Sequence, residues 1–428
     1  MLKQIDPNNL EELRAFLKGR MADADPVILN NTAKIIKNVK ENGDAALYAY
    51  TKQFDHVVLN TLKASEEEID EAYAQVDLSL IEDMKEAAQN ITFYHEQQKA
   101  SGYHLEKEDG VYLGQRVLPL AKVGVYVPGG RAAYPSTVLM NVLPAKIAGV
   151  KEIVMVTPPN KEGKIAPVIA AAAKIAGVTS IFKVGGAQAV AALAYGTETI
   201  PQVDKIVGPG NAYVASAKRL VFGQVDIDMI AGPSEILVIA DSKADPRAVA
   251  ADLISQAEHD PLACSILLTI DTALAEAVQQ ELKRQSAMLE RKEIIEKSLA
   301  AYGTLMICKD IEQCIEISNQ IAPEHLELMI EDANEHLDQI YNAGSVFLGY
   351  VTCESIGDYF GGTNHVLPTN GTARFASALS CDDFVKRSCY LHYSKQALQR
   401  DGAKIMNIAE HEGLGGHANA VKVRLDNE

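Results

Sequence analysis

Residues 153–194 read IVMVTPPNKEGKIAPVIAAAAKIAGVTSIFKVGGAQAVAALA, and this stretch decides the fold. Two short apolar runs, 153–156 and 181–184, are each followed by an alanine-rich segment, 167–176 and 187–194. Short apolar runs bounded by Gly and Pro are typical of buried strands, and the alanine-rich segments have the composition of helices. Strand–helix alternation predicts a parallel sheet whose two faces are covered by helices.

The same alternation continues on both sides of this stretch. Further strands are expected at 123–127 and 205–207, with helices at 138–148 and 212–221. A second series of strands is predicted at 235–240, 264–270, 304–307, 326–330 and 345–348. Within it, Asp245-Pro246 has the N-cap and first-turn residues of a helix. The chain is therefore expected to have an α/β fold with two parallel-sheet units in tandem.

Helical segments are expected before and after these two units. An amphipathic pattern at 27–40 predicts a helix. Ser65 and Glu68 have the spacing of a capping box, so another helix is expected to begin there. From about residue 378 the pattern returns to helix and loop, and a last helix is predicted at 418–425.

The composition restricts the classes of protein to which the chain can belong. With 428 residues, of which 47% are hydrophobic, it is long enough for two or three domains with sizeable cores. A net charge of −17 disfavours binding to nucleic acid and to anionic membranes. The six cysteines form no CxxC pair and are expected to be reduced thiols. Because no apolar run approaches ~18 residues and the N-terminus lacks the apolar core of a signal peptide, we expect a soluble cytoplasmic enzyme.

Three glycine-rich turns follow strands of the first series. They are PGGR at 128–131, GGAQ at 185–188 and GPGN at 208–211. Glycine is an ordinary turn residue, so one such turn carries little weight, but parallel strands bring all three turns to one edge of the sheet. Backbone N–H groups at strand-to-helix turns can bind phosphate, which favours a nucleotide site there. The G-x-G-x-x-G fingerprint is absent, so a dinucleotide site would differ from the standard one.

Side chains of the kinds that bind a divalent metal are spread over the second half of the chain. Gln256 and His259 are spaced i, i+3, which places both on one face of a helix that the following proline is expected to end. Asp358 and His365 lie in a glycine-punctuated loop, and His417 lies close to the C-terminus. Imidazole and carboxylate donors without cysteine favour a catalytic site for zinc or a neighbouring transition metal. A single histidine near a helix end is more often a core or surface residue, and spacing alone supports only His259 as a ligand.

Two further motifs carry groups suited to catalysis or substrate binding. Glu324 and His325 are adjacent just before an apolar strand, and a carboxylate and an imidazole are suited to proton transfer. An isolated Glu-His pair is more often a surface feature, but its position at a strand start favours the functional edge of the sheet. Ser234 lies in a tight loop, where it can cap a turn or bind a substrate hydroxyl or amine.

Together these motifs resemble those of the histidinol dehydrogenase family. The resemblance is carried by IDMIAGPSE at 227–235 and by DLISQAEHDP at 252–261. It continues, in the order of the family, with VPGG at 127–130, VGPGN at 207–211, APEHL at 322–326, GTNHVLP at 362–368 and HANAV at 417–421. None of these motifs would suffice alone, but together they are highly specific.

The resemblance implies an activity and its cofactors. Enzymes of this family oxidise L-histidinol through L-histidinaldehyde to L-histidine, the last step of histidine biosynthesis. They use two NAD and one zinc per active site. The zinc ligands implied for this chain are Gln256, His259, Asp358 and His417.

The resemblance also implies roles for other residues. Glu324 and His325 would be the catalytic pair, and NAD would be contacted by Tyr126, Gln188 and Asn211. The substrate would be held by the four metal-site residues together with Ser234, His325, His365 and Glu412. The three NAD contacts agree with the glycine-rich edge, which the residues indicate independently.

The domain organisation implied by the resemblance is two incomplete Rossmann-like parallel-sheet domains in tandem with small helical N- and C-terminal domains. In this sequence the NAD-binding domain would span 126–234, and the metal and catalytic domain would combine 25–125 with 235–377. The small N-terminal segment would span 1–24 and the C-terminal domain 378–428.

The resemblance further implies a homodimer in which the C-terminal domain reaches the partner's active site. Glu412 and His417 would then act in trans. Glu410 and His411 are alternatives for the role of Glu412, because all three lie in one glycine-rich run.

Three other functions are compatible with the residues alone. One is a dehydrogenase of the same superfamily that acts on another small alcohol, such as a sulfonated diol. Against it, Ser234, His365 and Glu412 favour a cationic amino alcohol as substrate, because a carboxylate attracts an ammonium group and repels a sulfonate. The second is a zinc hydrolase that uses Glu324 and metal-bound water. The third, a non-catalytic nucleotide-binding regulator, would have no need for an acid, a base and a metal site.

Overall fold

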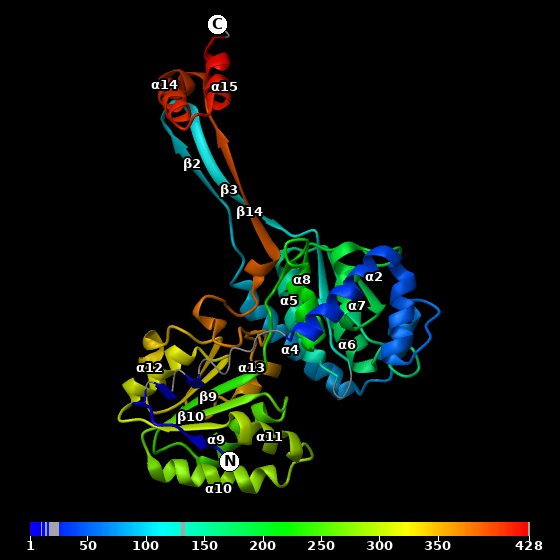
Figure 1. The fold of residues 1–428 in the computed structure, drawn as a ribbon, viewed down its shortest axis with the longest axis vertical. Coiled ribbons are helices and arrows are strands. Elements are labelled where there is room, and N and C mark those ends of the chain that lie inside the picture. Colours follow the sequence, from blue (N-terminus) through cyan, green and yellow to red (C-terminus); the bar gives the residue numbers. More distant parts are fainter. Residues whose placement is uncertain (10, 13–14, 17–24, 130–132, 427–428) are drawn as a thin grey trace. The chain divides into compact units, whose positions relative to one another are not determined.

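The computed structural model describes residues 1–9, 11–12, 15–16, 25–129 and 133–426. The chain forms two compact units, named here the main unit (1–98 and 121–384) and the second unit (99–120 and 385–428) (Figure 1). Residues 10, 13–14 and 17–24 of the expected N-terminal segment 1–24, and Gly130 and Arg131 of the first glycine-rich turn, lie outside the described residues.

The first parallel sheet contains the strands predicted from the quoted stretch and its neighbours. They are β4 (Lys122–Tyr126), β5 (Glu152–Thr157), β6 (Ser180–Lys183), β7 (Lys205–Val207) and β8 (Asp226–Ile227). Their order is β6-β5-β4-β7-β8, and every neighbouring pair is parallel. The chain leaves β4 toward one side for β5 and β6, and later returns to the other side for β7. The direction in which the chain adds strands therefore reverses between the neighbouring strands β4 and β7, which makes this a topological switch point. Open α/β sheets leave a crevice at the carboxyl ends of the strands at such a point.

The second parallel sheet repeats this topology. Its strands are β1 (Lys3–Gln4), β9 (Glu235–Ala240), β10 (Cys264–Thr269), β11 (Thr304–Ile307), β12 (His325–Met329) and β13 (Ser345–Leu348). Their order is β1-β11-β10-β9-β12-β13, again entirely parallel. Apart from the edge strand β1, the first strand of the series is central, with the next two on one side and the last two on the other. The expectation of two incomplete Rossmann-like sheets in tandem is confirmed.

The first sheet is covered by the helices that connect its strands, and further helices pack on these. The connections between its strands are α5 (Pro135–Ala148), α6 (Pro167–Ala176), α7 (Gly186–Tyr195) and α8 (Ala212–Val221). Three helices from the N-terminal part, α2 (Pro26–Tyr50), α3 (Glu66–Tyr73) and α4 (Leu78–Glu96), pack on α7 and α8, on α6 and on α5, respectively (Figure 1). Residues 187–194 of α7 are all buried. Alanine predominates there because a helix covered on both sides packs closely only with small side chains.

Local capping explains where several helices begin. Ser65 Oγ accepts a hydrogen bond from the Glu68 N–H at 3.1 Å, as the capping-box spacing predicts. Asp245 accepts one from the Arg247 N–H at 2.9 Å and begins α9 (Pro246–Ala257), as predicted. Within α2, Gly43 has φ +50 and breaks the helical geometry. No described helix is both long and apolar enough to cross a membrane.

The ends of two elements differ from the prediction. The helix carrying Gln256 ends at Ala257, so His259 lies in the turn that follows rather than on the helix. The Asp260 side chain accepts a hydrogen bond from the Leu262 N–H at 2.9 Å. The turn that this bond stabilises competes with helical geometry, so the helix ends ahead of Pro261. Asp358, expected in a loop, lies in the short helix α13 (Glu354–Tyr359).

The second unit contains a three-stranded sheet that the sequence analysis did not predict. It consists of β2 (Tyr103–Lys107), β3 (Val111–Pro119) and β14 (Val385–His392), paired antiparallel in the order β14-β3-β2. The expectation of helix and loop after about residue 378 therefore holds only for α14 (Lys395–His411) and α15 (Gly415–Leu425). The strands were missed because all residues of β2 and most of β14 are exposed, which removes the apolar periodicity of a packed strand.

Candidate active site

The candidate catalytic residues meet at the amino ends of two neighbouring strands. Glu235 is the first residue of β9 and His325 the first of β12, as the position of the Glu-His motif predicts. The last turn of α9 lies beside them, because Gln256 Nε2 is 3.0 Å from His325 Nδ1. Rossmann-like sheets usually bind ligands at the carboxyl ends of their strands. The second sheet therefore uses the edge opposite to the usual one.

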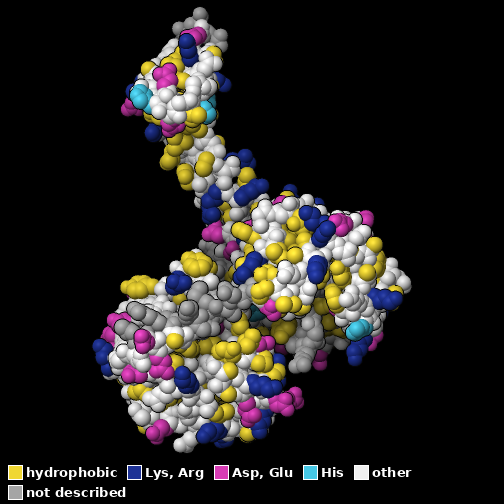
Figure 2. Space-filling model, in the orientation of Figure 1, with side chains coloured by type: hydrophobic (Ala, Val, Ile, Leu, Met, Phe, Trp, Pro, Cys, Tyr) yellow, Lys and Arg dark blue, Asp and Glu magenta, His cyan; other side chains and the backbone are white. Residues whose placement is uncertain are grey.

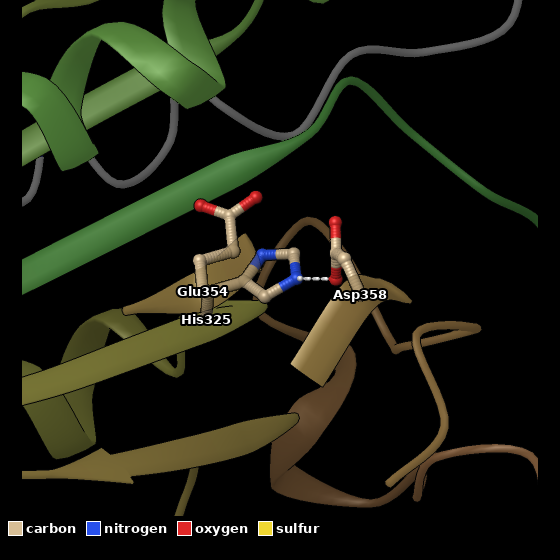
Figure 3. Close-up of side chains that lie close together, drawn as sticks. All are labelled: His325, Glu354 and Asp358. Atoms are coloured by element: carbon tan, nitrogen blue, oxygen red, sulfur yellow. Dashed lines mark ion pairs between the residues drawn. The ribbon is translucent and has the colours of Figure 1, made fainter. Parts of the chain in front are cut away.

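The imidazole of His325 is buried and directs Nε2 toward Asp358 (Figure 3). Its Nδ1 lies 3.0 Å from the backbone oxygen of Glu235. Because a carbonyl oxygen only accepts hydrogen bonds, Nδ1 carries the proton of the neutral imidazole. Nε2 lies 3.5 Å from Asp358 Oδ1 and has no hydrogen-bond partner among the described residues. Nε2 is therefore the nitrogen that gains or loses the proton when the ring changes its charge, and it does so facing Asp358.

Three carboxyl groups set the proton affinity of this imidazole. Glu324 Oε2 accepts a hydrogen bond from the Glu235 N–H at 2.8 Å, and burial raises the pKa of Glu324 to about 8. Burial likewise raises the pKa of Glu354 to about 7. Burial by itself lowers the pKa of His325, but Glu354, Glu324 and Asp358 together raise it well above its usual range. The site thus pairs a strong imidazole base with a carboxyl group that titrates close to neutrality.

Among the described residues, His325, Glu354 and Asp358 form a group that could hold a cation. Their nitrogen and oxygen atoms lie within 4.8 Å of one another (Figure 3). Glu354 Oε2, like His325 Nε2, has no hydrogen-bond partner in the part of the chain that the structure describes. Nitrogen and oxygen donors without sulfur are the kind that zinc binds at a catalytic site. Of the expected ligands, Asp358 belongs to this group and Gln256 contacts it.

Two further histidines lie close to Asp358. His365 Nδ1 is 3.1 Å from the backbone oxygen of Asp358. Burial acts to raise the pKa of Asp358, but His325, His365 and His259 outweigh it and lower the pKa below its usual range. His259 is accessible to solvent just beyond the C-terminal end of α9, where the partial negative charge of the helix favours a cation. An ionised carboxylate, two histidines and a helix C-terminus therefore converge on one place.

Three acidic residues of this region were not singled out from the sequence: Glu327 and Glu354, which are buried, and Asp252, which is partly buried. Glu327, two residues further along β12, accepts a hydrogen bond from the Glu354 N–H at 2.8 Å and so ties β12 to the start of α13. Burial raises the pKa of Glu327 to about 9 and that of Asp252 to about 6, and the negative charge of Asp252 adds to the rise in the pKa of Glu327. The available signal was a charged residue inside the apolar run 326–330. Glu354 could have been found from its i, i+4 spacing to Asp358.

At the first sheet, the glycine-rich turns meet at the switch point between β4 and β7. Tyr126, the last residue of β4, is buried, and its hydroxyl accepts a hydrogen bond from the Gly186 N–H at 3.0 Å. A Cβ atom at Gly129 or Gly185 would overlap Pro158, so these two turns require glycine for close approach. Burial raises the pKa of Tyr126 to about 12, so its hydroxyl stays protonated and can donate to a ligand.

The other two expected NAD contacts differ in their accessibility. Gln188 is buried in the first turn of α7, against the backbone of Gly186. Asn211 is exposed and caps α8, with Oδ1 accepting hydrogen bonds from the N–H groups of Tyr213 and Val214 at 3.0 and 3.2 Å. Because its oxygen is used for capping, the amide N–H groups of Asn211 are the ones that can reach a ligand.

Gly208 provides a stability test of the third turn. It has φ +109, and a Cβ atom there would overlap the backbone oxygen of Tyr126. Gly208→Ala is expected to lower the free energy of unfolding by roughly 2–4 kcal/mol, from backbone strain plus the clash. Gly223→Ala is the matched control, because Gly223 has φ +97 but no neighbour within 4 Å of its Cβ position. Equal losses in chemical denaturation would show that the contact with Tyr126 is unimportant.

The remaining expected site residues lie outside this group. Ser234 immediately precedes Glu235, and its backbone oxygen accepts a hydrogen bond from the Cys264 N–H at 2.9 Å. Glu412 and His417 belong to the second unit, where both are exposed: Glu412 follows the end of α14, and His417 lies in the first turn of α15. The main unit by itself therefore brings together Gln256, Glu324, His325, Asp358 and His365.

Comparison with known proteins gives one consistent result. A family model described as histidinol dehydrogenase matches residues 19–425. The histidinol dehydrogenase of Clostridium acetobutylicum is 54% identical over 427 residues, 99% of each chain, and that of Halalkalibacterium halodurans is 53% identical over 93% of this chain and 94% of its own. The crystal structure of histidinol dehydrogenase from Elizabethkingia anophelis superimposes with a TM-score of 0.94 at 42% identity and covers 99% of this chain and 98% of that one. The chain therefore belongs to the histidinol dehydrogenase family.

Proposed function

We propose that this protein oxidises L-histidinol to L-histidine in two successive NAD-dependent steps at a zinc centre. The observation that carries the proposal is the position of His325 Nε2, which is buried, lies 3.5 Å from Asp358 Oδ1 and belongs to a ring beside the buried carboxyl group of Glu324. In a chain of this family, that arrangement provides the base, the second proton acceptor and the acidic ligand that a four-electron oxidation requires.

The two bases divide the proton transfers between them. In the first step, His325 Nε2 accepts the hydroxyl proton while the carbon atom transfers a hydride to NAD, which yields L-histidinaldehyde. In the second step, Glu324 accepts a proton from the water that adds to the aldehyde, and the hydrate transfers a second hydride to a second NAD. A pKa of about 8 allows Glu324 to accept a proton and release it again near neutral pH.

Zinc would be held by Gln256, His259 and Asp358 of the main unit together with His417. When bound, it would supply positive charge that orients the substrate nitrogens and polarises the reacting oxygen. The C-terminal end of α9 and the ionised Asp358 both favour a cation at this place. Ser234, His365 and Glu412 would complete the contacts to the substrate, with Glu412 facing its ammonium group.

Glu412 and His417 would act across a homodimer. The second unit carries exposed apolar side chains on its sheet, including Tyr103 at 53%, Leu105 at 50% and Leu391 at 66% exposure (Figure 2). Exposed apolar patches on a soluble protein commonly mark surfaces that a partner covers. A second copy that covers this sheet would place the helices α14 and α15 of one subunit beside the other subunit.

The stoichiometry of the reaction tests the proposal. We expect roughly two NADH per L-histidinol consumed, with turnover lost on chelation and restored by zinc. A ratio near one would mean that the aldehyde leaves the site and that Glu324 does not have its assigned role. Absence of NADH from zinc-loaded protein would contradict the proposal and direct attention to other small alcohols or to hydrolysis.

A further inference from the structure

A buried ion pair at the first sheet takes no part in the mechanism described above. Lys218 of α8 contacts Asp228, the residue that follows β8, and their side chains are only 3% and 1% exposed. Asp228 belongs to the motif 227–235, which the sequence analysis singled out. Burial of two charges costs several kcal/mol for each ion, and a well-packed apolar pair is often equally stable. Stability is therefore a weak explanation for this pair.

Both members of the pair bind the backbone of one residue, Gly208. Lys218 Nζ donates a hydrogen bond to the Gly208 oxygen at 3.0 Å, and Asp228 Oδ2 accepts one from the Gly208 N–H at 2.8 Å. Asp228 is itself fixed to the sheet, because its N–H donates to the Ile206 oxygen at 3.2 Å. The two opposite charges thus hold both the backbone N–H and the backbone oxygen of Gly208.

The position of Gly208 gives these contacts a function. It is the first residue of the turn 208–211, which follows β7 at the switch point and ends at Asn211. The segment that begins at Asp228 leads to Ser234. The ion pair therefore lies where the turn of the cofactor site and the segment of the substrate site begin.

We propose that Lys218 and Asp228 are positioning residues that fix the turn 208–211 for NAD. The inference rests on the proposed function, because Tyr126 and Asn211 are its NAD contacts. A turn that is held in place before binding loses less entropy when the cofactor binds. The pair therefore contributes to cofactor affinity more than to folding.

The test is the double substitution Lys218→Met/Asp228→Asn, which removes both charges and the bond to the Gly208 oxygen. Each single substitution would leave a buried charge unpaired and can prevent folding, whereas the double variant leaves no net charge. We expect KM for NAD and the dissociation constant of NADH to rise roughly tenfold or more, with KM for histidinol and the zinc content unchanged. Binding of NADH is measured by fluorescence, so that cofactor affinity is known independently of turnover.

A second lysine of the first sheet provides a control. Lys205, at the amino end of β7, is also buried and pairs with Asp226 at 3.1 Å and Asp383 at 3.3 Å. Lys205→Met/Asp226→Asn is expected to change the melting temperature without changing NADH affinity. If both double variants bind NADH as the wild type does, the pair is only structural and the proposal is overturned. If the wild type itself does not bind NADH, the proposed function fails instead.

Discussion

Replacement of Glu324 by glutamine is expected to slow aldehyde oxidation by roughly 10²- to 10⁴-fold while alcohol oxidation changes much less. Glutamine keeps an oxygen that can accept the hydrogen bond from the Glu235 N–H, so the side chain stays in place. It cannot take a proton from water, and only the second step needs that proton transfer. In the wild type, burial raises the pKa of Glu324 to about 8. Its basic form therefore grows as the pH rises toward 8, and the variant should lose this increase in the rate of the aldehyde step.

Single-turnover measurements with L-histidinol and with L-histidinaldehyde separate the two steps. Glu327→Gln is the matched control, because Glu327 is a buried carboxyl group of β12, three residues after Glu324, that contacts Glu354 and not the reacting atoms. It should leave the ratio of the two rates close to that of the wild type. Equal losses of both steps in Glu324→Gln would reject the division of labour between Glu324 and His325.

Mixed dimers should recover activity from two inactive variants. We expect His325→Asn and His417→Asn each to be nearly inactive alone, since one lacks the base and the other a zinc ligand. If His417 acts in trans, a dimer of one variant with the other contains one intact site. Random exchange of subunits should then restore roughly a quarter of the wild-type activity, because about half of the dimers are mixed.

The reciprocal experiment controls for nonspecific stabilisation. Wild-type chain is mixed with an excess of chain that carries both substitutions, so that most wild-type subunits are in mixed dimers. In the trans arrangement every mixed dimer has two defective sites, so activity falls below that of the wild-type subunits present. Activity that merely follows the amount of wild-type chain would place His417 in the site of its own subunit and remove the need for a dimer.

The parts of the fold that the sequence predicted are those decided by local patterns. The buried strands are short apolar runs, the alanine-rich helices 167–176 and 212–221 occur at the predicted residues, and Asp245-Pro246 begins its helix. The sheet of the second unit was missed because it forms between segments remote in sequence and is exposed along much of its length. Pairing of that kind depends on tertiary contacts, which no window of neighbouring residues contains.

The candidate site was predictable only where its residues are neighbours in the chain. Glu324 and His325 are adjacent, and Gln256 and His259 lie three residues apart, so both pairs could be noticed from spacing. The connection between the pairs could be inferred only from the family resemblance, because it arises from the alignment of β9 with β12. The Glu-His pair at a strand start indicated an edge of the second sheet, but strand patterns alone do not show that the amino edge, rather than the usual carboxyl edge, carries the site.

The discontinuity of the second unit has a consequence for the order of events during synthesis. Residues 99–120 leave the ribosome early, but β3 receives its second neighbour only when β14 has been made. At ordinary rates of translation this delay is on the order of tens of seconds, during which one edge of β3 is open to incorrect pairing. Because Glu412 and His417 are made after the main unit, the nascent chain can complete that unit before these two proposed site residues exist. Under the proposed roles, catalysis begins only after release of the finished chain and its association with a second one.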